Sequence, residues 1–189
     1  MTAIPPLPEE LETERLVLRT PSSEDAAVYR RLWTERDPRV PPHRRIDADG
    51  RPTEDDIAAE LADPAWSGRS GLRTVVRKKD GAVLGYCGIV ADAERAHEAP
   101  EIAFELLRAV HGRGYATEAA RAVLDRAQDA SLATLRASVW DWNTASRRVL
   151  AKLGFVETGE VDRVSTHGRS LVTLRDLAHG RRDGGAPIQ

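Results

Sequence analysis

The chain has 189 residues, which is enough for one domain with a sizeable core, and 41% of them are hydrophobic while 31% are charged. This balance is typical of a soluble globular protein, and a net charge of −2 argues against the overall basic field of nucleic-acid-binding proteins. Cys87 is the single cysteine, which excludes an intrachain disulfide and a cysteine-based zinc site. The N-terminus lacks the pattern of a signal peptide, and no apolar stretch approaches the ~20 residues of a membrane span. We therefore expect a cytoplasmic protein that binds neither membranes nor nucleic acid.

The N-terminal half predicts a strand, two helices and a β-hairpin, separated by loops. Ser22 and Asp25 have the spacing of a capping box, which predicts a helix that ends at Asp37-Pro38. The next stretch is rich in proline and arginine, and Thr53 then caps a short helix. Asp80-Gly81 is a hairpin turn signal, and Gly85 and Gly88 inside the second hairpin strand predict a bulge or a close backbone contact. The predicted elements are a strand at 15–20, a loop at 37–52, a helix at 54–61, a loop at 66–71, strands at 72–78 and 82–91, and a polar connection at 91–99.

The C-terminal half alternates strands with helices and ends in a second hairpin. Small apolar residues recur at helical spacing after Gly114, which favours a helix packed closely on a sheet. A later helix begins at Asn143 or Thr144 and is ended by Gly154. The predicted elements are a strand at 101–107, a helix at 114–128, a strand at 132–140, a helix ending at 152, and strands at 155–165 and 170–178. This order predicts a mixed α/β single domain.

A turn with two glycines, His111-Gly112-Arg113-Gly114, joins a predicted buried strand to a predicted helix. Glycine lets a ligand approach the backbone closely, and the first amides of a helix attract a phosphate or pyrophosphate. The P-loop pattern requires Lys followed by Ser or Thr where this chain has Tyr115-Ala116. The Rossmann pattern requires a third glycine where this chain has Thr117, so neither nucleotide motif matches.

Two motifs together match another family. Residues 112–119 read Gly-Arg-Gly-Tyr-Ala-Thr-Glu-Ala, and residues 143–155 read Asn-Thr-Ala-Ser-Arg-Arg-Val-Leu-Ala-Lys-Leu-Gly-Phe. With the opening Glu-Thr-Glu-Arg-Leu-Val-Leu-Arg at 12–19, the chain resembles the GNAT superfamily of acetyl-CoA-dependent N-acetyltransferases, most closely its RimJ/RimL branch, which acetylates protein N-termini. The resemblance implies a mixed central sheet of about seven strands, splayed between the fourth and fifth and flanked by about four helices. It places the domain at 12–178, after an N-terminal extension at 1–11 and before a tail at 179–189 that its composition predicts to be disordered.

The resemblance also implies an acetyl-CoA site and no metal. The pyrophosphate is expected at the backbone amides of the glycine turn, although Ala109 stands where the superfamily commonly has Arg or Gln, and Arg108 or Arg113 can supply that charge. Asn143 is expected near the thioester, or as a helix N-cap, or in both roles. The residues expected to bind the cofactor are Leu106, Leu107, Val110, His111, Gly112, Arg113, Gly114, Tyr115, Ala116, Asn143 and Ser146.

Attack on a thioester needs a neutral amine, and therefore a general base. Glu101 and Glu105 share one face of a central strand, where a carboxylate is costly to bury unless it is paired or functional. By resemblance Glu101 is the base and Glu105 is the second candidate. The structural alternative is a salt bridge to Arg108 or Arg136.

The departing thiolate needs a proton or a hydrogen bond. Many GNAT enzymes have a tyrosine for this purpose at the position that Leu150 occupies here. By resemblance to the RimJ/RimL branch, Ser146 replaces it, with a hydrogen bond that stabilises the thiolate. Cys87 shows no sign of a covalent acetyl-enzyme route.

The acceptor is expected to be a primary amine that enters beside the 37–52 loop, where His43, Arg44 and Arg45 are candidate contacts. Trp140 and Trp142 either form a wall of the acceptor pocket or pack in the core. The acceptor is either a protein N-terminus or a small amine, such as an amino sugar or an antibiotic. The alternative to an enzyme is an acyl-CoA-binding module without turnover. The chain is also a candidate homodimer. The remaining expectations are that Glu118 pairs along its helix or caps it, and that His111 packs.

Overall fold

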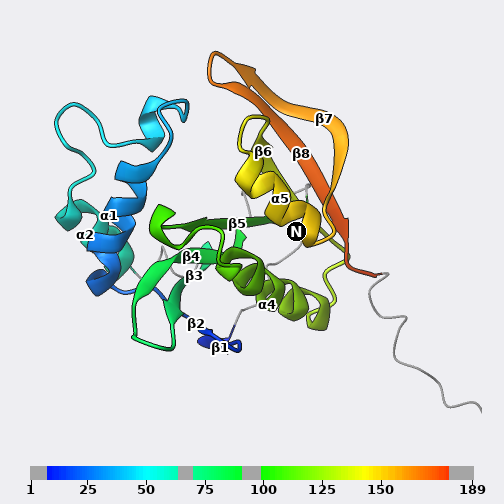
Figure 1. Cartoon of the computed structure of the whole chain (residues 1–189), viewed down its shortest axis with the longest axis horizontal. Helices are drawn as coiled ribbons and strands as arrows, with labels where there is room; N and C mark the ends of the chain where they lie inside the picture. Colours follow the sequence, from blue (N-terminus) through cyan, green and yellow to red (C-terminus); the bar gives the residue numbers. More distant parts are fainter. Residues whose placement is uncertain (1–7, 64–69, 91–98, 179–189) are drawn as a thin grey trace, which may run out of the picture.

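The computed structural model describes residues 8–63, 70–90 and 99–178 (Figure 1). In these ranges eight strands form one sheet in the order β1-β2-β3-β4-β5-β6-β8-β7. All neighbouring strands are antiparallel except β5 and β6. The strands are β1 Glu10–Glu12, β2 Leu16–Arg19, β3 Ser70–Arg77, β4 Val83–Val90, β5 Glu101–Leu106, β6 Thr134–Trp140, β7 Val156–Ser165 and β8 Gly168–Asp176. The helices are α1 Ala26–Glu35, α2 Glu54–Ala62, α4 Tyr115–Asp129 and α5 Thr144–Lys152, with short 3-10 turns η1 Ser23–Asp25, η2 Pro42–Arg44 and η4 Arg108–Val110.

The seven expected strands and four expected helices are all present, with ends that differ by one or two residues. One strand is additional: β1 pairs with β2 and overlaps the expected N-terminal extension by two residues. Strand β3 begins at Ser70, inside the loop expected at 66–71. The rest of that loop, most of the expected connection at 91–99 and the tail at 179–189 lie outside the described residues.

The helices begin and end where the sequence signals predict. Ser22 with Asp25 and Thr53 with Asp56 form capping boxes before α1 and α2. Asn143 caps α5 by accepting a hydrogen bond from the backbone amide of Ser146. Gly154 follows the last turn of α5 with a left-handed φ of 79°.

The sheet separates between β5 and β6. These strands share a single register pair, Glu101 with Arg136, whereas β4 and β5 share six. The backbone amide of Arg136 donates to the carbonyl of Pro100, and beyond this point the two strands diverge. This confirms the expected splay between the fourth and fifth predicted strands, and it places Glu101 at the vertex of the opening.

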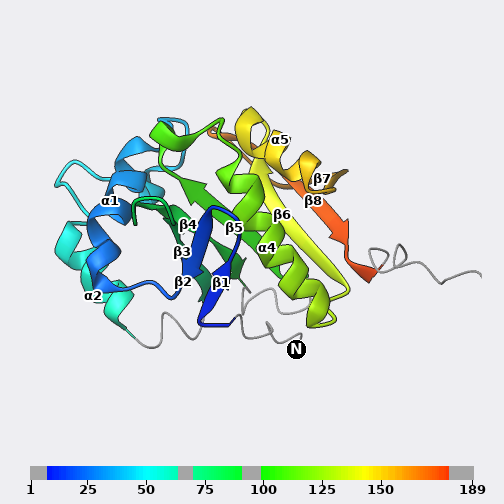
Figure 2. The same ribbon diagram turned by 60° about the horizontal axis from the view of Figure 1, so that its bottom comes forward.

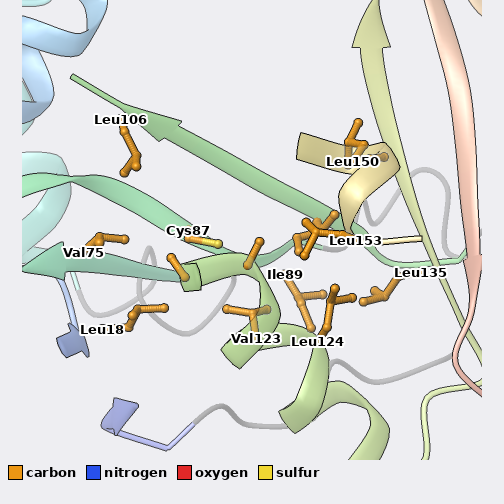
Figure 3. Close-up of a cluster of buried hydrophobic side chains, with 14 of the residues drawn as sticks. Leu18, Val75, Cys87, Ile89, Leu106, Val123, Leu124, Leu135, Leu150 and Leu153 are labelled. Carbon is orange, nitrogen blue, oxygen red and sulfur yellow. The ribbon is translucent and has the colours of Figure 1, made fainter. Parts of the chain in front are cut away.

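Helix α4 forms the main core on one face of the sheet (Figures 1 and 2). Its apolar face is fully buried, and Figure 3 shows Val123 and Leu124 gathered with Ile89 and Leu135 of the sheet. On β4, Cys87 and Ile89 face this core, whereas Tyr86 stacks on Tyr29 of α1 at a ring distance of 5.7 Å. Because side chains alternate along a strand, α1 and α4 lie on opposite faces of the sheet.

The two glycines of β4 allow close strand packing. A Cβ at Gly88 would lie 2.1 Å from the carbonyl oxygen of Gly71, and one at Gly85 would lie 2.1 Å from that of Glu105. The β3–β4 register also shifts between Val75 and Val76. Both readings of these glycines, a bulge and a close backbone contact, are therefore confirmed.

Candidate active site

A cleft of about 1280 Å³ opens where β5 and β6 separate. Its walls come from β5, the glycine turn, the first turn of α4, β6, α5 and the segment after α1. The opening thus brings together the N-terminus of α4, both glutamates of β5 and the first turns of α5.

The glycine turn has the geometry of an anion-binding loop. Gly112 and Gly114 have left-handed φ values of 75° and 82°, which glycine adopts at little cost. Gly114 is the N-cap of α4 and has no side chain to bind the first amides of the helix. Tyr115, Ala116 and Thr117 follow it and line the cleft. Free helix amides and the positive end of the dipole face the space in which a pyrophosphate is expected, so the residues suit the CoA group.

Most of the expected cofactor-binding residues line this cleft. They are Leu106, Val110, His111, Gly112, Gly114, Tyr115, Ala116, Asn143 and Ser146. Leu107 and Arg113 are not among the lining residues: Leu107 is buried in the core, and the Arg113 carbonyl accepts a hydrogen bond from Arg15. His111 is exposed rather than packed, and its Nε2 bonds the Leu106 carbonyl at 2.8 Å. Arg108, Arg148 and Lys152 also line the cleft and supply positive charge that Ala109 does not.

Glu101 lies at the vertex of the cleft and is half-buried. Its carboxylate accepts hydrogen bonds from the amide of Ser138 at 3.3 Å and from the Ser138 hydroxyl at 3.1 Å. Burial raises the pKa of Glu101 above its usual value against the effect of these two bonds, and the nearby Asp162 raises it further. Arg136 approaches it at 3.9 Å, so one expected ion pair is present at a long distance.

Glu105 has different partners. Arg36 binds its carboxylate through Nη2 at 2.7 Å and Nε at 2.9 Å, and the Tyr86 hydroxyl donates to it at 2.8 Å. The expectation of an ion pair between Glu105 and Arg108 or Arg136 is therefore wrong, because Arg36 at the end of α1 lies closer. Arg36 also donates to the carbonyl of Arg44 at 2.6 Å, which fixes the 37–52 loop beside β5.

The segment after α1 and a pair of tryptophans border the cleft near the glutamates. Arg44 lines the cleft, whereas His43 and Arg45 are not among the lining residues. Trp140 and Trp142 stack with ring centroids 6.2 Å apart, and both line the cleft. Of the two expected roles, a wall of the cleft describes them better than a place in the buried core.

Sequence reasoning missed four polar residues of the site. Arg36, Tyr86, Ser138 and Asp162 all line the cleft and contact Glu101, Glu105 or Arg136. Alternation along the 132–140 strand places Ser138 on the same face as Arg136, which was a usable signal. No sequence motif near Arg36 or Asp162 predicts their place in the site, because each reaches the site from a distant part of the chain.

Two further features concern groups outside the cleft. Cys87 is fully buried, and burial raises the pKa of its thiol to about 12. Glu118 pairs with Arg15 and Thr13, not with its own helix as expected. Within the described residues no helix is long and apolar enough to span a bilayer, and no cluster of three His, Cys, Asp or Glu side chains is arranged for a metal ion.

Comparison with known proteins identifies the family. The acetyltransferase (GNAT) domain model matches residues 15–156. The uncharacterized N-acetyltransferase p20 of Bacillus licheniformis is 31% identical over 158 residues, covering 80% of this chain and 84% of that protein. The ribosomal-protein-S5-alanine acetyltransferase of Vibrio fischeri superimposes with a TM-score of 0.67 at 19% identity, covering 94% of this chain and 99% of that one. An aminoglycoside acetyltransferase in complex with coenzyme A superimposes with a TM-score of 0.61 at 18% identity, covering 85% and 94%. This chain belongs to the GNAT family and is an acetyl-CoA-dependent N-acetyltransferase.

Proposed function

We propose that this enzyme transfers acetyl directly from acetyl-CoA to the N-terminal amine of a protein or peptide, with Glu101 as the general base. One observation carries the proposal: Glu101 lies at the vertex of the same cleft that the N-terminus of α4 borders. A carboxylate there can reach an amine held between the two halves of the cleft. The expected resemblance to the RimJ/RimL branch supports the choice of acceptor.

The proposed reaction needs two proton movements. Glu101 removes a proton from the incoming ammonium, directly or through a water, and the neutral nitrogen attacks the thioester carbonyl. The carbon–sulfur bond then breaks, and the nitrogen loses a second proton as the amide forms and the thiol is restored. Ser146, one turn from Asn143 on α5, donates a hydrogen bond to the departing sulfur in this scheme.

Glu105 is the weaker candidate for the base. Its carboxylate is already bound by the guanidinium of Arg36 through Nε and Nη2. We assign it instead to positioning, because the Arg36 that it binds also holds the carbonyl of Arg44.

The charge of the cleft favours a peptide over a polycationic small molecule. Two of its carboxylates, Glu105 and Asp162, are already bound by Arg36 and Arg136. An aminoglycoside needs several free carboxylates, whereas a peptide N-terminus brings one positive charge. Among the described residues that line the cleft, seven are basic and five acidic: Arg36, Arg44, Arg108, Arg136, Arg148, Lys152 and Arg163 against Glu35, Asp37, Glu101, Glu105 and Asp162.

A matched set of acceptors tests this assignment. Thiol release from acetyl-CoA is measured with short peptides that have a free N-terminus, with the same peptides N-acetylated, and with an aminoglycoside. We expect release with the free peptides alone and an acetyl group on their terminal nitrogen by mass spectrometry. Release with the aminoglycoside and none with any peptide would assign the enzyme to small amines instead.

A further inference from the structure

We infer that Arg15 and Glu118 form a brace that holds the glycine turn and the first turn of α4 in the geometry that binds the CoA pyrophosphate. The opening segment at 12–19, which the proposed reaction does not use, thereby becomes a positioning element for the cofactor. This inference rests on the proposed pyrophosphate site.

The brace joins segments that lie 103 residues apart in the sequence. Both oxygens of Glu118 are bound: Oε1 accepts from the Thr13 hydroxyl at 2.6 Å and the Arg15 amide at 2.9 Å, and Oε2 accepts from Arg15 Nε at 2.7 Å. Arg15 Nη2 adds an ion pair with the same oxygen at 2.6 Å. A single carboxylate in the first turn of α4 is therefore fixed by both side chains and the backbone of the opening segment.

Besides binding this carboxylate, Arg15 contacts the glycine turn. Its Nη1 donates to the carbonyl of Arg113 at 3.1 Å, between the two glycines. Its guanidinium lies 4.5 Å from the centre of the Tyr115 ring and 3.4 Å from the place of a Cβ on Gly114. Arg15 is not among the residues that line the cleft, so it supports the turn from outside.

A turn built on two left-handed glycines needs such support. Glycine has more backbone freedom to lose than any other residue, and residues 111–114 are exposed. Fixing the turn before the ligand arrives removes this entropy from the cost of binding. A planar guanidinium that contacts three groups at once suits this task better than a flexible ammonium.

The pairing also removes an electrostatic conflict. Glu118 lies in the first turn of α4, where an unpaired carboxylate would repel a pyrophosphate. Burial raises the pKa of Glu118, but hydrogen bonds from Thr13 and Arg15 outweigh burial and hold the pKa below its usual value. The carboxylate is thus charged and neutralised by Arg15.

The test compares two ligands that differ in the pyrophosphate. Acetyl-CoA carries it, whereas S-acetylpantetheine has the same thioester arm without the pyrophosphate and nucleotide. Dissociation constants are measured by calorimetry for acetyl-CoA and by NMR titration for S-acetylpantetheine. The variants are Arg15→Ala, Arg15→Lys and Glu118→Gln, with melting temperatures recorded for each. Arg126→Ala is the matched control, because it removes an exposed ion pair with Asp129 at the other end of α4.

If the brace positions the pyrophosphate site, its removal weakens the binding of acetyl-CoA but not that of S-acetylpantetheine. Arg15→Ala and Glu118→Gln weaken acetyl-CoA binding about tenfold, or about 1.4 kcal/mol, and leave S-acetylpantetheine unchanged. Arg15→Lys fails to restore affinity, because charge alone does not hold the turn, and Arg126→Ala binds both ligands as the wild type does. Full affinity in Arg15→Lys, or equal losses for both ligands, would overturn the brace. A wild type that binds acetyl-CoA no better than S-acetylpantetheine would refute the pyrophosphate site itself, and the brace with it.

Discussion

The two glutamates of β5 lie four residues apart on the same face of the strand, yet their surroundings differ. Glu105 is bound by Arg36 and Tyr86, whereas Glu101 accepts hydrogen bonds from Ser138 and approaches Arg136 at 3.9 Å. Burial raises the pKa of Glu101, and a base with a raised pKa holds a proton more strongly near neutral pH. The two environments therefore suit different tasks, proton transfer for Glu101 and positioning for Glu105.

The kinetic prediction concerns Glu101→Gln. We expect kcat/KM to fall about a hundredfold, because an amide cannot accept the proton. In the wild type, kcat/KM should rise with pH through the raised pKa of Glu101, and this limb should be absent in the variant. Measuring kcat/KM across pH checks both points. A variant that retains the wild-type profile would show that another group is the base.

The same substitution predicts a pH-dependent change in stability. The pKa of Glu101 is higher in the folded protein than in the unfolded chain, so its contribution to folding is complete below the unfolded value and is lost as pH rises through the folded value. As pH rises from about 4 to about 8, the free energy of unfolding of Glu101→Gln should therefore increase relative to that of the wild type. Urea unfolding of both proteins at these two pH values is the measurement. A difference that stays constant with pH would contradict the proposed cause of the shift.

Among the elements, β4 packs closely on β3 with one edge and pairs with its other edge to β5, the strand that carries the glutamates. Gly88→Ala should destabilise the fold by more than about 3 kcal/mol, because its Cβ would lie 2.1 Å from a backbone oxygen that cannot rotate away. Gly81→Ala, in the hairpin turn, meets nothing within 4 Å and should cost about 1 kcal/mol for its left-handed φ. Urea unfolding of both variants measures the two losses in the free energy of unfolding. Similar losses would show that strands β3 and β4 can move apart at Gly88.

The loop after α1 depends on Arg36, whose side chain is 9% exposed. Arg36→Ala should raise the KM for the peptide acceptor about tenfold and leave the dissociation constant for acetyl-CoA unchanged, because it frees the carbonyl of Arg44 while the glycine turn stays intact. Arg31→Ala, which removes the exposed pair with Glu35 on the same helix, is the control. Steady-state kinetics with calorimetry separates the two substrates. An unchanged KM for the acceptor would mean that the loop does not contact it.

At the scale of the whole molecule, the sequence predicted the elements better than their partners. Periodicity, capping boxes and glycines are local signals, which is why the order of strands and helices could be predicted, whereas the splay was expected from the resemblance to the GNAT family. Strand β1 was missed because three residues carry too little pattern and gain their order by pairing with β2. The partners of Glu105 and Glu118 lie 69 and 103 residues away, so they follow from topology rather than from any nearby motif.

The candidate site likewise contains one part with local sequence motifs and one part assembled from distant segments. The glycine turn and the two helix starts that are expected to bind the cofactor could be located from the sequence, because each is marked by a short local motif. The rest of the cleft is assembled from separate segments that carry Arg36, Tyr86, Ser138 and Asp162, and only the folded sheet brings them to Glu101, Glu105 and Arg136.

Thiol release from acetyl-CoA in the presence of a peptide with a free N-terminus, compared between the wild type and Glu101→Gln, tests the proposed base and the proposed acceptor together. We expect the wild type to release CoA and acetylate the terminal nitrogen, and the variant to bind acetyl-CoA equally well while its turnover falls about a hundredfold. Acetyl-CoA binding without release on any peptide or small amine would contradict the proposed acetyl transfer to an amine in this cleft.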